Sequence, residues 1–86
     1  MEFEFDQRKS ESNATKHGID FIEAQQLWED PDCLVVPAVT HGEPRFMVIG
    51  KIGSRHWSAI VTPREDLIRI ISVRRSRERE VEAYEN

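Results

Sequence analysis

The stretch from Leu67 to Arg75, LIRIISVRR, decides the fold of this 86-residue chain. Its apolar residues are mostly β-branched and follow one another too densely for an edge strand with one face in water, so they predict a central strand. Arginines lie within this run and at its end, at Arg69, Arg74 and Arg75. A buried strand would hold these guanidinium groups in fixed places, which suits the recognition of phosphate or carboxylate.

The segments before this run predict the strands beside it. Residues 46–51 and 57–62 are predicted strands, joined by the glycine-containing hairpin connection Ile52-Gly53-Ser54-Arg55. A turn over residues 63–66 leads into the central strand, and short links of this kind make consecutive strands antiparallel neighbours. A further strand is predicted over residues 34–36, where Pro37 indicates an edge or a bulge, followed by a turn over residues 41–44.

The start of the chain predicts one strand and one helix. Phe3 and Phe5 alternate with acidic residues, which is the period of a half-exposed strand. Asp6 is placed to cap a polar surface helix over residues 7–16, and Gly18 is placed to end it.

Two more helices complete the pattern. One begins at Asp20, with Glu23 in the position that completes a capping box, and ends at residues 30–32. Its predicted buried face consists of Phe21, Ala24, Leu27 and Trp28. Ser76 is placed to cap a last helix over residues 77–84. The inward side chains of that helix are Val81 and Tyr84, and its polar side carries Glu78, Glu80 and Glu82.

The predicted order of elements is therefore β-α-α-β-β-β-β-α, in a single domain over residues 1–86. This order predicts an α+β fold with a small, twisted, mainly antiparallel sheet of about five strands, and with the two early helices on one face. The other face of the sheet is left open and needs a partner or a function.

Charge is distributed unevenly along a chain whose formal net charge is −4. Residues 1–34 contain nine acidic and three basic residues, whereas residues 35–63 contain one acidic and three basic residues. Between Arg64 and Arg79 there are six arginines and three acidic residues. Such a chain would bind phosphate at one place without a general affinity for nucleic acid.

Several classes of protein are not indicated. No apolar run approaches the roughly 20 residues of a membrane span, and the start MEFEFDQRKS lacks the pattern of a signal peptide, so we expect a cytoplasmic protein with no membrane association. The single cysteine, Cys33, has no intrachain disulfide partner and is expected to be a small buried residue. No zinc-binding cluster, paired acidic metal site or nucleotide-binding loop is evident, so no metal or cofactor is expected.

Strand parity predicts a polar patch on the open face of the sheet, because neighbouring residues on a strand point to opposite faces. Placing Ser72 and Arg74 beside Thr62 and Arg64 puts two guanidiniums on that face. A slip of one residue in this register would exchange Arg74 for Arg75. The predicted core side of the same strand consists of Trp57, Ala59 and Val61.

Lys16 and His17 form the second candidate site. The dipole of the predicted helix also favours a lysine and a histidine at its C-terminus, so a purely structural role stays open on composition alone. Histidine titrates near neutral pH and can therefore move a proton. His41 and His56 lie near hairpin turns and are predicted to be solvated surface residues. Tyr84 either docks the last helix or donates its hydroxyl to a ligand.

If these groups converge, they suit the cleavage of RNA without a metal ion. Arginines would hold the scissile phosphate and the charge that develops on it. One proton-transfer group would activate the ribose 2′-OH, and another would protonate the leaving 5′-oxygen.

Two separated motifs resemble a known family. They are F-E-F-D-x-x-K-x-x-x-N-x-x-K-H-G-I-x-F-x-x-A from Phe3 to Ala24, and R-I-I-S-V-R-R-x-x-x-x-E-x-x-x-Y-E from Arg69 to Glu85. Together with the strand over residues 45–50 and the length of the chain, they resemble the BrnT toxins of bacterial type II toxin–antitoxin systems over essentially the whole chain. Phe5 stands where a tryptophan is common in the family, and Val73 stands where an alanine is common.

The resemblance implies a RelE-like fold and a metal-independent RNA endonuclease that inhibits translation. It implies a BrnA-like antitoxin that neutralises the toxin and binds operator DNA, so that DNA is contacted only through the antitoxin, in a dimer or hetero-oligomer. The catalytic candidates that it implies are Lys16, His17, Arg64, Arg74 and Tyr84. The candidates for binding RNA phosphate are Arg75, which it also implies, and Arg69, which lies within the central strand. It does not assign the general base and the general acid.

Two alternatives stay open. One is a non-catalytic binding module whose arginine patch anchors an acidic partner or operator DNA, and the other is a degenerate toxin that keeps the fold and the antitoxin but little activity. An antitoxin that presents basic and apolar side chains would fit the acidic body of the protein, and we expect it to cover the open face of the sheet.

Overall fold

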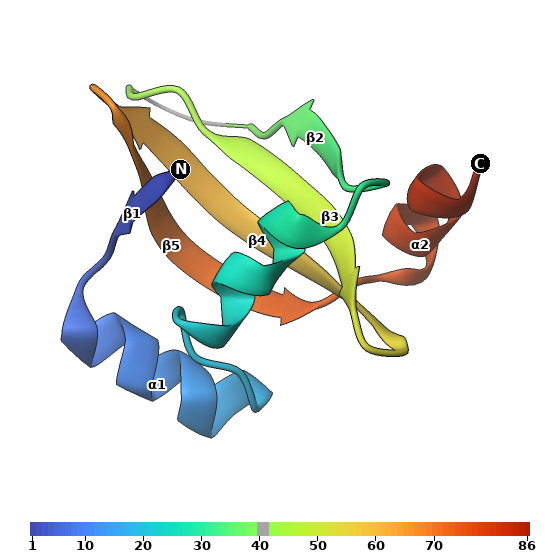
Figure 1. Ribbon diagram of the computed structural model, residues 1–86, viewed down its shortest axis with the longest axis horizontal. Helices are drawn as coiled ribbons and strands as arrows, with labels where there is room; N and C mark the ends of the chain where they lie inside the picture. Colours follow the sequence, from blue (N-terminus) through green and yellow to red (C-terminus); the bar gives the residue numbers. More distant parts are fainter. Residues whose placement is uncertain (40–41) are drawn as a thin grey trace.

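The computed structural model describes residues 1–39 and 42–86, which form a five-stranded sheet with helices beside it and on one face (Figure 1). The strands are β1 Glu2–Glu4, β2 Leu34–Pro37, β3 Phe46–Ile52, β4 Arg55–Arg64 and β5 Leu67–Arg75. The helices are α1 Gln7–His17, the 3₁₀ helix η1 Glu23–Glu29 and α2 Glu78–Glu85. The predicted α+β class with five strands is confirmed. The predicted turn over residues 41–44, with His41, lies partly outside the described residues.

The strand β5 lies inside the sheet, in the spatial order β1-β5-β4-β3-β2. It runs parallel to β1, with Phe3 beside Ile68, and antiparallel to β4. The remaining strands follow as antiparallel neighbours. Pro37 ends the outer strand β2, as its missing N–H requires. The hairpin between β3 and β4 turns at Gly53, whose φ of +64° lies in the left-handed region that favours glycine.

The register of β5 with β4 differs from the predicted one, because antiparallel pairing places Ser72 beside Ile60 rather than Thr62, and Arg74 beside Ser58 rather than Arg64. The strand β5 also contains a bulge. Ile60 pairs with Ser72 and Val61 pairs with Ile70, so Ile71 is an extra residue on β5. The parity of β5 therefore reverses at Ile71, and residues that an uninterrupted strand would place on one face lie on opposite faces.

The register separates the two arginines that were predicted to share a patch. Arg74 pairs with Ser58, whereas Arg64 pairs with Leu67 at the other end of the ladder. Six residues separate Ser58 from Arg64 along β4, which corresponds to about 20 Å. The two guanidiniums therefore do not form one site.

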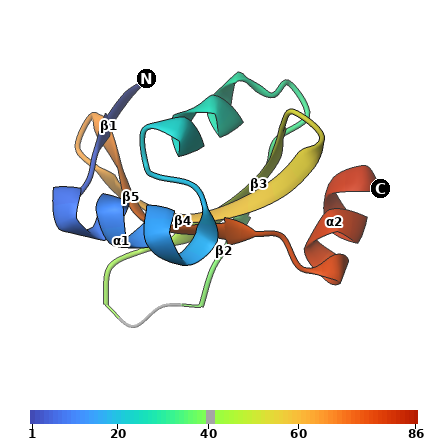
Figure 2. The same cartoon turned by 90° about the horizontal axis from the view of Figure 1, so that it is seen from below.

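The core lies between the sheet and η1, which covers one face (Figure 2). Its buried members are Ile19, Phe21, Ala24, Leu27, Val48, Trp57, Ala59, Val61, Ile70 and Val73. Of the predicted buried face, Phe21, Ala24 and Leu27 are buried and Trp28 is partly buried, and the predicted core side of β4 is confirmed. The helix itself is 3₁₀ rather than α, with bonds such as that from the Gln25 N–H to the Ile22 carbonyl. The helix begins at Glu23 with Ile22 as its N-cap, so the predicted start and capping box at Asp20 are wrong. Asp20 Oδ1 nevertheless accepts from the N–H groups of Ile22 and Glu23 in the turn before the helix.

The helix α1 lies beside the edge of β5 and not on the face that η1 covers, contrary to the prediction (Figure 2). Asp6 caps its start and Gly18, with a φ of +79°, ends it, as predicted. The reason for its place is Asn13, which is buried. The Asn13 Nδ2 donates to the carbonyls of Ile19 at 2.8 Å and Val73 at 2.9 Å, and its Oδ1 accepts from the Val73 N–H at 3.1 Å. The Asn13 side chain thus bonds the backbone of β5 as a neighbouring strand would, beyond the point where β1 ends.

The last helix, α2, begins at Glu78, with Arg77 rather than the predicted Ser76 at the N-cap position. Glu80 was predicted on the polar side of this helix, but it is only 8% exposed. The reason is a set of donors beneath it: the Ser58 hydroxyl donates to Glu80 Oε1 at 2.8 Å, and the Arg77 N–H donates to the same oxygen at 3.0 Å. Among the described residues, no helix combines the length and apolar composition needed to cross a bilayer.

Candidate functional site

A pocket of about 190 Å³ lies between α1 and the bulge of β5. Its lining residues are Lys9, Ser12, Asn13, Lys16 and His17 from α1, with Ile71 and Ser72 from β5. Positions 9, 12, 13 and 16 are three or four residues apart, so they share one face of an α-helix. Asn13 fixes that face against β5 through its bonds to Val73. We call this site the α1–β5 pocket.

The α1–β5 pocket is positively charged. Lys9, Lys16 and His17 are exposed, and none of them forms a hydrogen bond or ion pair through its side chain with another described residue. The hydroxyls of Ser12 and Ser72 add hydrogen-bond donors, and no carboxylate lines the pocket. Two ammonium groups, an imidazole and two hydroxyls at one place are suited to a phosphate group.

The arginines at the end of β5 do not line this pocket. Arg74 lies on the same face of β5 as Ser72, but its Nη1 and Nη2 donate to the two carboxylate oxygens of Glu80, each at 2.8 Å. This bidentate contact lowers the pKa of Glu80 to about 2 and raises the pKa of Arg74. The guanidinium of Arg75 lies on the opposite face, 5.6 Å from the centre of the Trp57 ring. Both arginines therefore hold parts of the fold together.

The other two arginine candidates lie elsewhere and contact carboxylates. Arg64 Nη2 is 3.8 Å from Glu43 Oε2. Arg69 Nη1 donates to Glu4 Oε2 at 3.0 Å, which joins β5 to β1. The four candidate arginines thus make four separate contacts, and the two that were predicted to form a patch, Arg64 and Arg74, lie apart.

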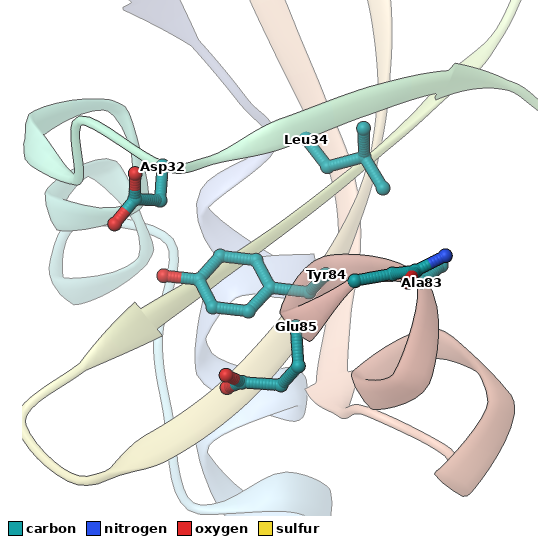
Figure 3. Close-up of a pocket in the computed structure, with 6 residues that line it drawn as sticks. Asp32, Leu34, Ala83, Tyr84 and Glu85 are labelled. Atoms are coloured by element: carbon teal, nitrogen blue, oxygen red, sulfur yellow. The ribbon is translucent and has the colours of Figure 1, made fainter.

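Tyr84 lies at a second pocket, of about 450 Å³, between α2 and the start of β2 (Figure 3). Its hydroxyl donates to Asp30 Oδ2 at 2.6 Å, which raises the pKa of Tyr84 to about 12 and lowers that of Asp30. Asp32 and Glu85 also line this pocket. Their negative charge makes it unsuited to phosphate, so Tyr84 acts here as a contact that docks α2.

His56 was predicted to be a solvated surface residue, and this is wrong. It is half-buried, its Nε2 lies 2.7 Å from Glu85 Oε2, and its ring meets the Tyr84 ring edge-on with centres 5.2 Å apart. It therefore belongs to the contacts that hold α2. Cys33 is half-buried, and burial raises the pKa of its thiol, which disfavours the reactive thiolate.

Sequence reasoning placed Lys16 and His17 together correctly but missed the rest of their pocket. Lys9 was available from its spacing, because it lies seven residues before Lys16, which is about two helical turns. Ser12 follows from the same spacing. Ser72 was assigned to Thr62 rather than to its neighbour Ile60, because the predicted patch let β4 and β5 run in the same direction although the two strands are antiparallel.

The family model described as the ribonuclease toxin BrnT of type II toxin–antitoxin systems matches residues 5–80. A comparison with curated proteins finds no match. The matched range contains α1, the whole sheet after β1, and the start of α2 through Glu80. Toxins of type II systems act together with an antitoxin protein. The chain belongs to the BrnT family of ribonuclease toxins.

Proposed function

We propose that this toxin is a metal-independent RNA endonuclease that inhibits translation, is neutralised by a BrnA-like antitoxin, and cleaves RNA at the α1–β5 pocket. The observation that carries the choice of site is the grouping of Lys9, Lys16 and His17 in one pocket without a carboxylate. Arg64, Arg74 and Tyr84 are not part of this site, because each contacts a carboxylate elsewhere.

The two lysines would bind the RNA backbone. Lys9 and Lys16 are seven residues apart on α1, a rise of about 10 Å along the helix axis. Ammonium groups at this spacing would contact separate phosphates of one strand, and the hydroxyls of Ser12 and Ser72 would donate to their oxygens. The acidic remainder of the chain would confine RNA to this place.

His17 would carry one of the two proton transfers. In the cleavage step the ribose 2′-oxygen forms a bond to phosphorus and the bond from phosphorus to the 5′-oxygen breaks. One group takes the proton of the 2′-OH, and another gives a proton to the 5′-oxygen. Imidazole suits either transfer, and the Lys16 ammonium would stabilise the negative charge that develops on the phosphate oxygens.

Replacing His17 by alanine is expected to slow the cleavage of single-stranded RNA by about a hundredfold, as the loss of a general acid or base does. The measurement is the first-order rate constant for cleavage by purified protein. Thr15→Ala is the matched control, because Thr15 is exposed on the same turn of α1 but does not line the pocket. It should cleave at the wild-type rate.

Equal rates for wild type, His17→Ala and Lys16→Ala, with unchanged melting temperatures, would remove this site assignment. If the wild-type protein binds RNA without cleaving it, and inhibits growth through its partner alone, the non-catalytic alternative replaces the proposal.

A further inference from the structure

An apolar groove of about 290 Å³ lies on the face of the sheet that η1 only partly covers. In Figure 1 this part of the sheet extends beyond η1, between β1 and β2. Its walls are formed by Trp28, Val35, Phe46, Pro63 and Ile68, and its floor by Val48 and Val61. Since Ser72 of the α1–β5 pocket lies on the opposite face, the groove is separate from the site proposed for RNA cleavage.

Every side chain that lines the groove is apolar, so it suits neither phosphate nor a polar metabolite. Val35 is 54% exposed in its wall, although Val48 and Val61 beneath are buried. The groove is also held open. Trp28 packs edge-on against Phe3, with ring centres 4.8 Å apart, which fixes the indole as a wall. A preformed apolar hollow of this kind suits a large apolar side chain.

The groove continues into the free edge of the sheet. Val35 lies on β2, which is the last strand of the sheet and pairs only with β3 among the described residues. Exposed edges are usually protected by charged residues, by proline or by a short strand. The strand β2 carries no charged residue, and its proline stands only at its last position, Pro37, so Leu34 to Val36 keep their backbone groups for pairing. An extended peptide can therefore pair with β2, and its alternate side chains would point to the face on which Val35 and the groove lie.

The charges around the groove favour a basic occupant. Three arginines stand next to lining residues, but Arg45 and Arg64 contact Glu43, and Arg69 contacts Glu4. Glu29, which follows Trp28, and Asp32, two residues before β2, form no ion pair with another described residue. Residues 1–34, which contain both, carry nine acidic and three basic residues. A neighbouring chain that is extended, apolar at one or two positions and flanked by lysine or arginine would complement this surface.

We propose that the groove and the edge of β2 anchor the antitoxin, through an extended segment that inserts a large apolar side chain beside Val35 and carries basic residues next to it. This inference rests on the neutralisation by an antitoxin in the proposed function, but not on the site of cleavage. It places the anchor on the face with η1, whereas the charge pattern of the sequence suggested the open face.

Replacing Val35 by lysine is the test, with the protein encoded by the gene adjacent to the toxin gene as the probe. We expect the dissociation constant of the complex to rise by about 30-fold or more, as for the loss of an anchor residue. The cleavage rate of the free toxin should stay unchanged, and the antitoxin should inhibit the variant only at correspondingly higher concentration. Val39→Lys is the matched control, because Val39 is 95% exposed and does not line the groove.

Wild-type affinity in Val35→Lys would overturn the proposal. So would a toxin that is dimeric alone and becomes monomeric in Val35→Lys, because the occupant would then be a second copy of the chain. If Val35→Lys does not fold, Val35→Ala should still weaken binding several-fold, and unchanged binding would count against the proposal. A wild-type protein that binds the antitoxin through Val35 but does not cleave RNA would contradict the proposed function alone.

Discussion

Replacing Asn13 by aspartate is expected to lower the free energy of unfolding by about 4 kcal/mol, since it leaves two buried carbonyls without a donor. In the wild type the Asn13 amide donates to the carbonyls of Ile19 and Val73 and accepts from the Val73 N–H. Aspartate has the same shape but turns an oxygen toward both carbonyls. The lost contact is buried and joins α1 to β5, so the substitution also destabilises the wall of the α1–β5 pocket.

Urea unfolding at pH 7 measures this loss. Ser12→Asp adds the same charge one position earlier, on an exposed residue of the same helix, and should change the free energy of unfolding by no more than about 0.5 kcal/mol. If Asn13→Asp is as stable as Ser12→Asp, the place of α1 beside β5 depends on something other than this amide.

Replacing Glu80 by alanine is expected to lower the free energy of unfolding by about 3 kcal/mol. The substitution removes one partner of a mostly buried ion pair and leaves the positive charge of Arg74 uncompensated. Arg74 would keep its guanidinium without the two 2.8 Å contacts, and the Ser58 hydroxyl would lose its acceptor. Removing both Arg74 and Glu80 should cost little more than removing Glu80 alone, since each single change already breaks the same contact. Glu82→Ala, exposed on the same helix, is the control.

The same contact predicts a pH dependence. The pKa of Glu80 is about 2 in the folded protein, against an ordinary value of 4.5. Its contribution is present above pH 4.5 and is lost as the pH falls from 4.5 toward 2, because the unfolded state takes up the proton first. The difference in free energy of unfolding between wild type and Glu80→Gln should therefore shrink across this range. A difference that stays constant down to pH 2 would show that Glu80 does not stabilise the fold as a carboxylate.

Much of the fold was predictable because local patterns and packing agree. The β-branched run of β5, the apolar face of η1 and the caps at Asp6 and Gly18 each specify one local structure, and the structure contains all of them. The place of α1 was not predictable, because a polar helix has no apolar stripe to show where it packs. Its docking depends on one amide, Asn13, whose partners lie on another element.

The site was harder to predict, because it depends on strand register and on pairing between charges. The antiparallel pairing of β4 and β5 places Arg64 beside Leu67 and Arg74 beside Ser58, at opposite ends of the two strands, and the extra residue Ile71 reverses the parity of β5. Sequence also shows that Arg74 is a cation but not that Glu80, six residues later, turns inward to meet it. Lys16 and His17 line one pocket, because they are adjacent at the end of one helix, and their role in catalysis stays a prediction.

The most direct test of the proposed site is an NMR titration of ¹⁵N-labelled toxin with a single-stranded oligonucleotide that lacks the 2′-OH and so resists cleavage. The α1–β5 pocket predicts that the largest shifts of backbone amide signals fall on residues 9–17 and 71–72. It also predicts that Lys9→Ala weakens binding while Arg8→Ala, next to it but outside the pocket lining, has a smaller effect. Shifts confined to residues 77–85 and to Arg64, with residues 9–17 unchanged, would contradict the account.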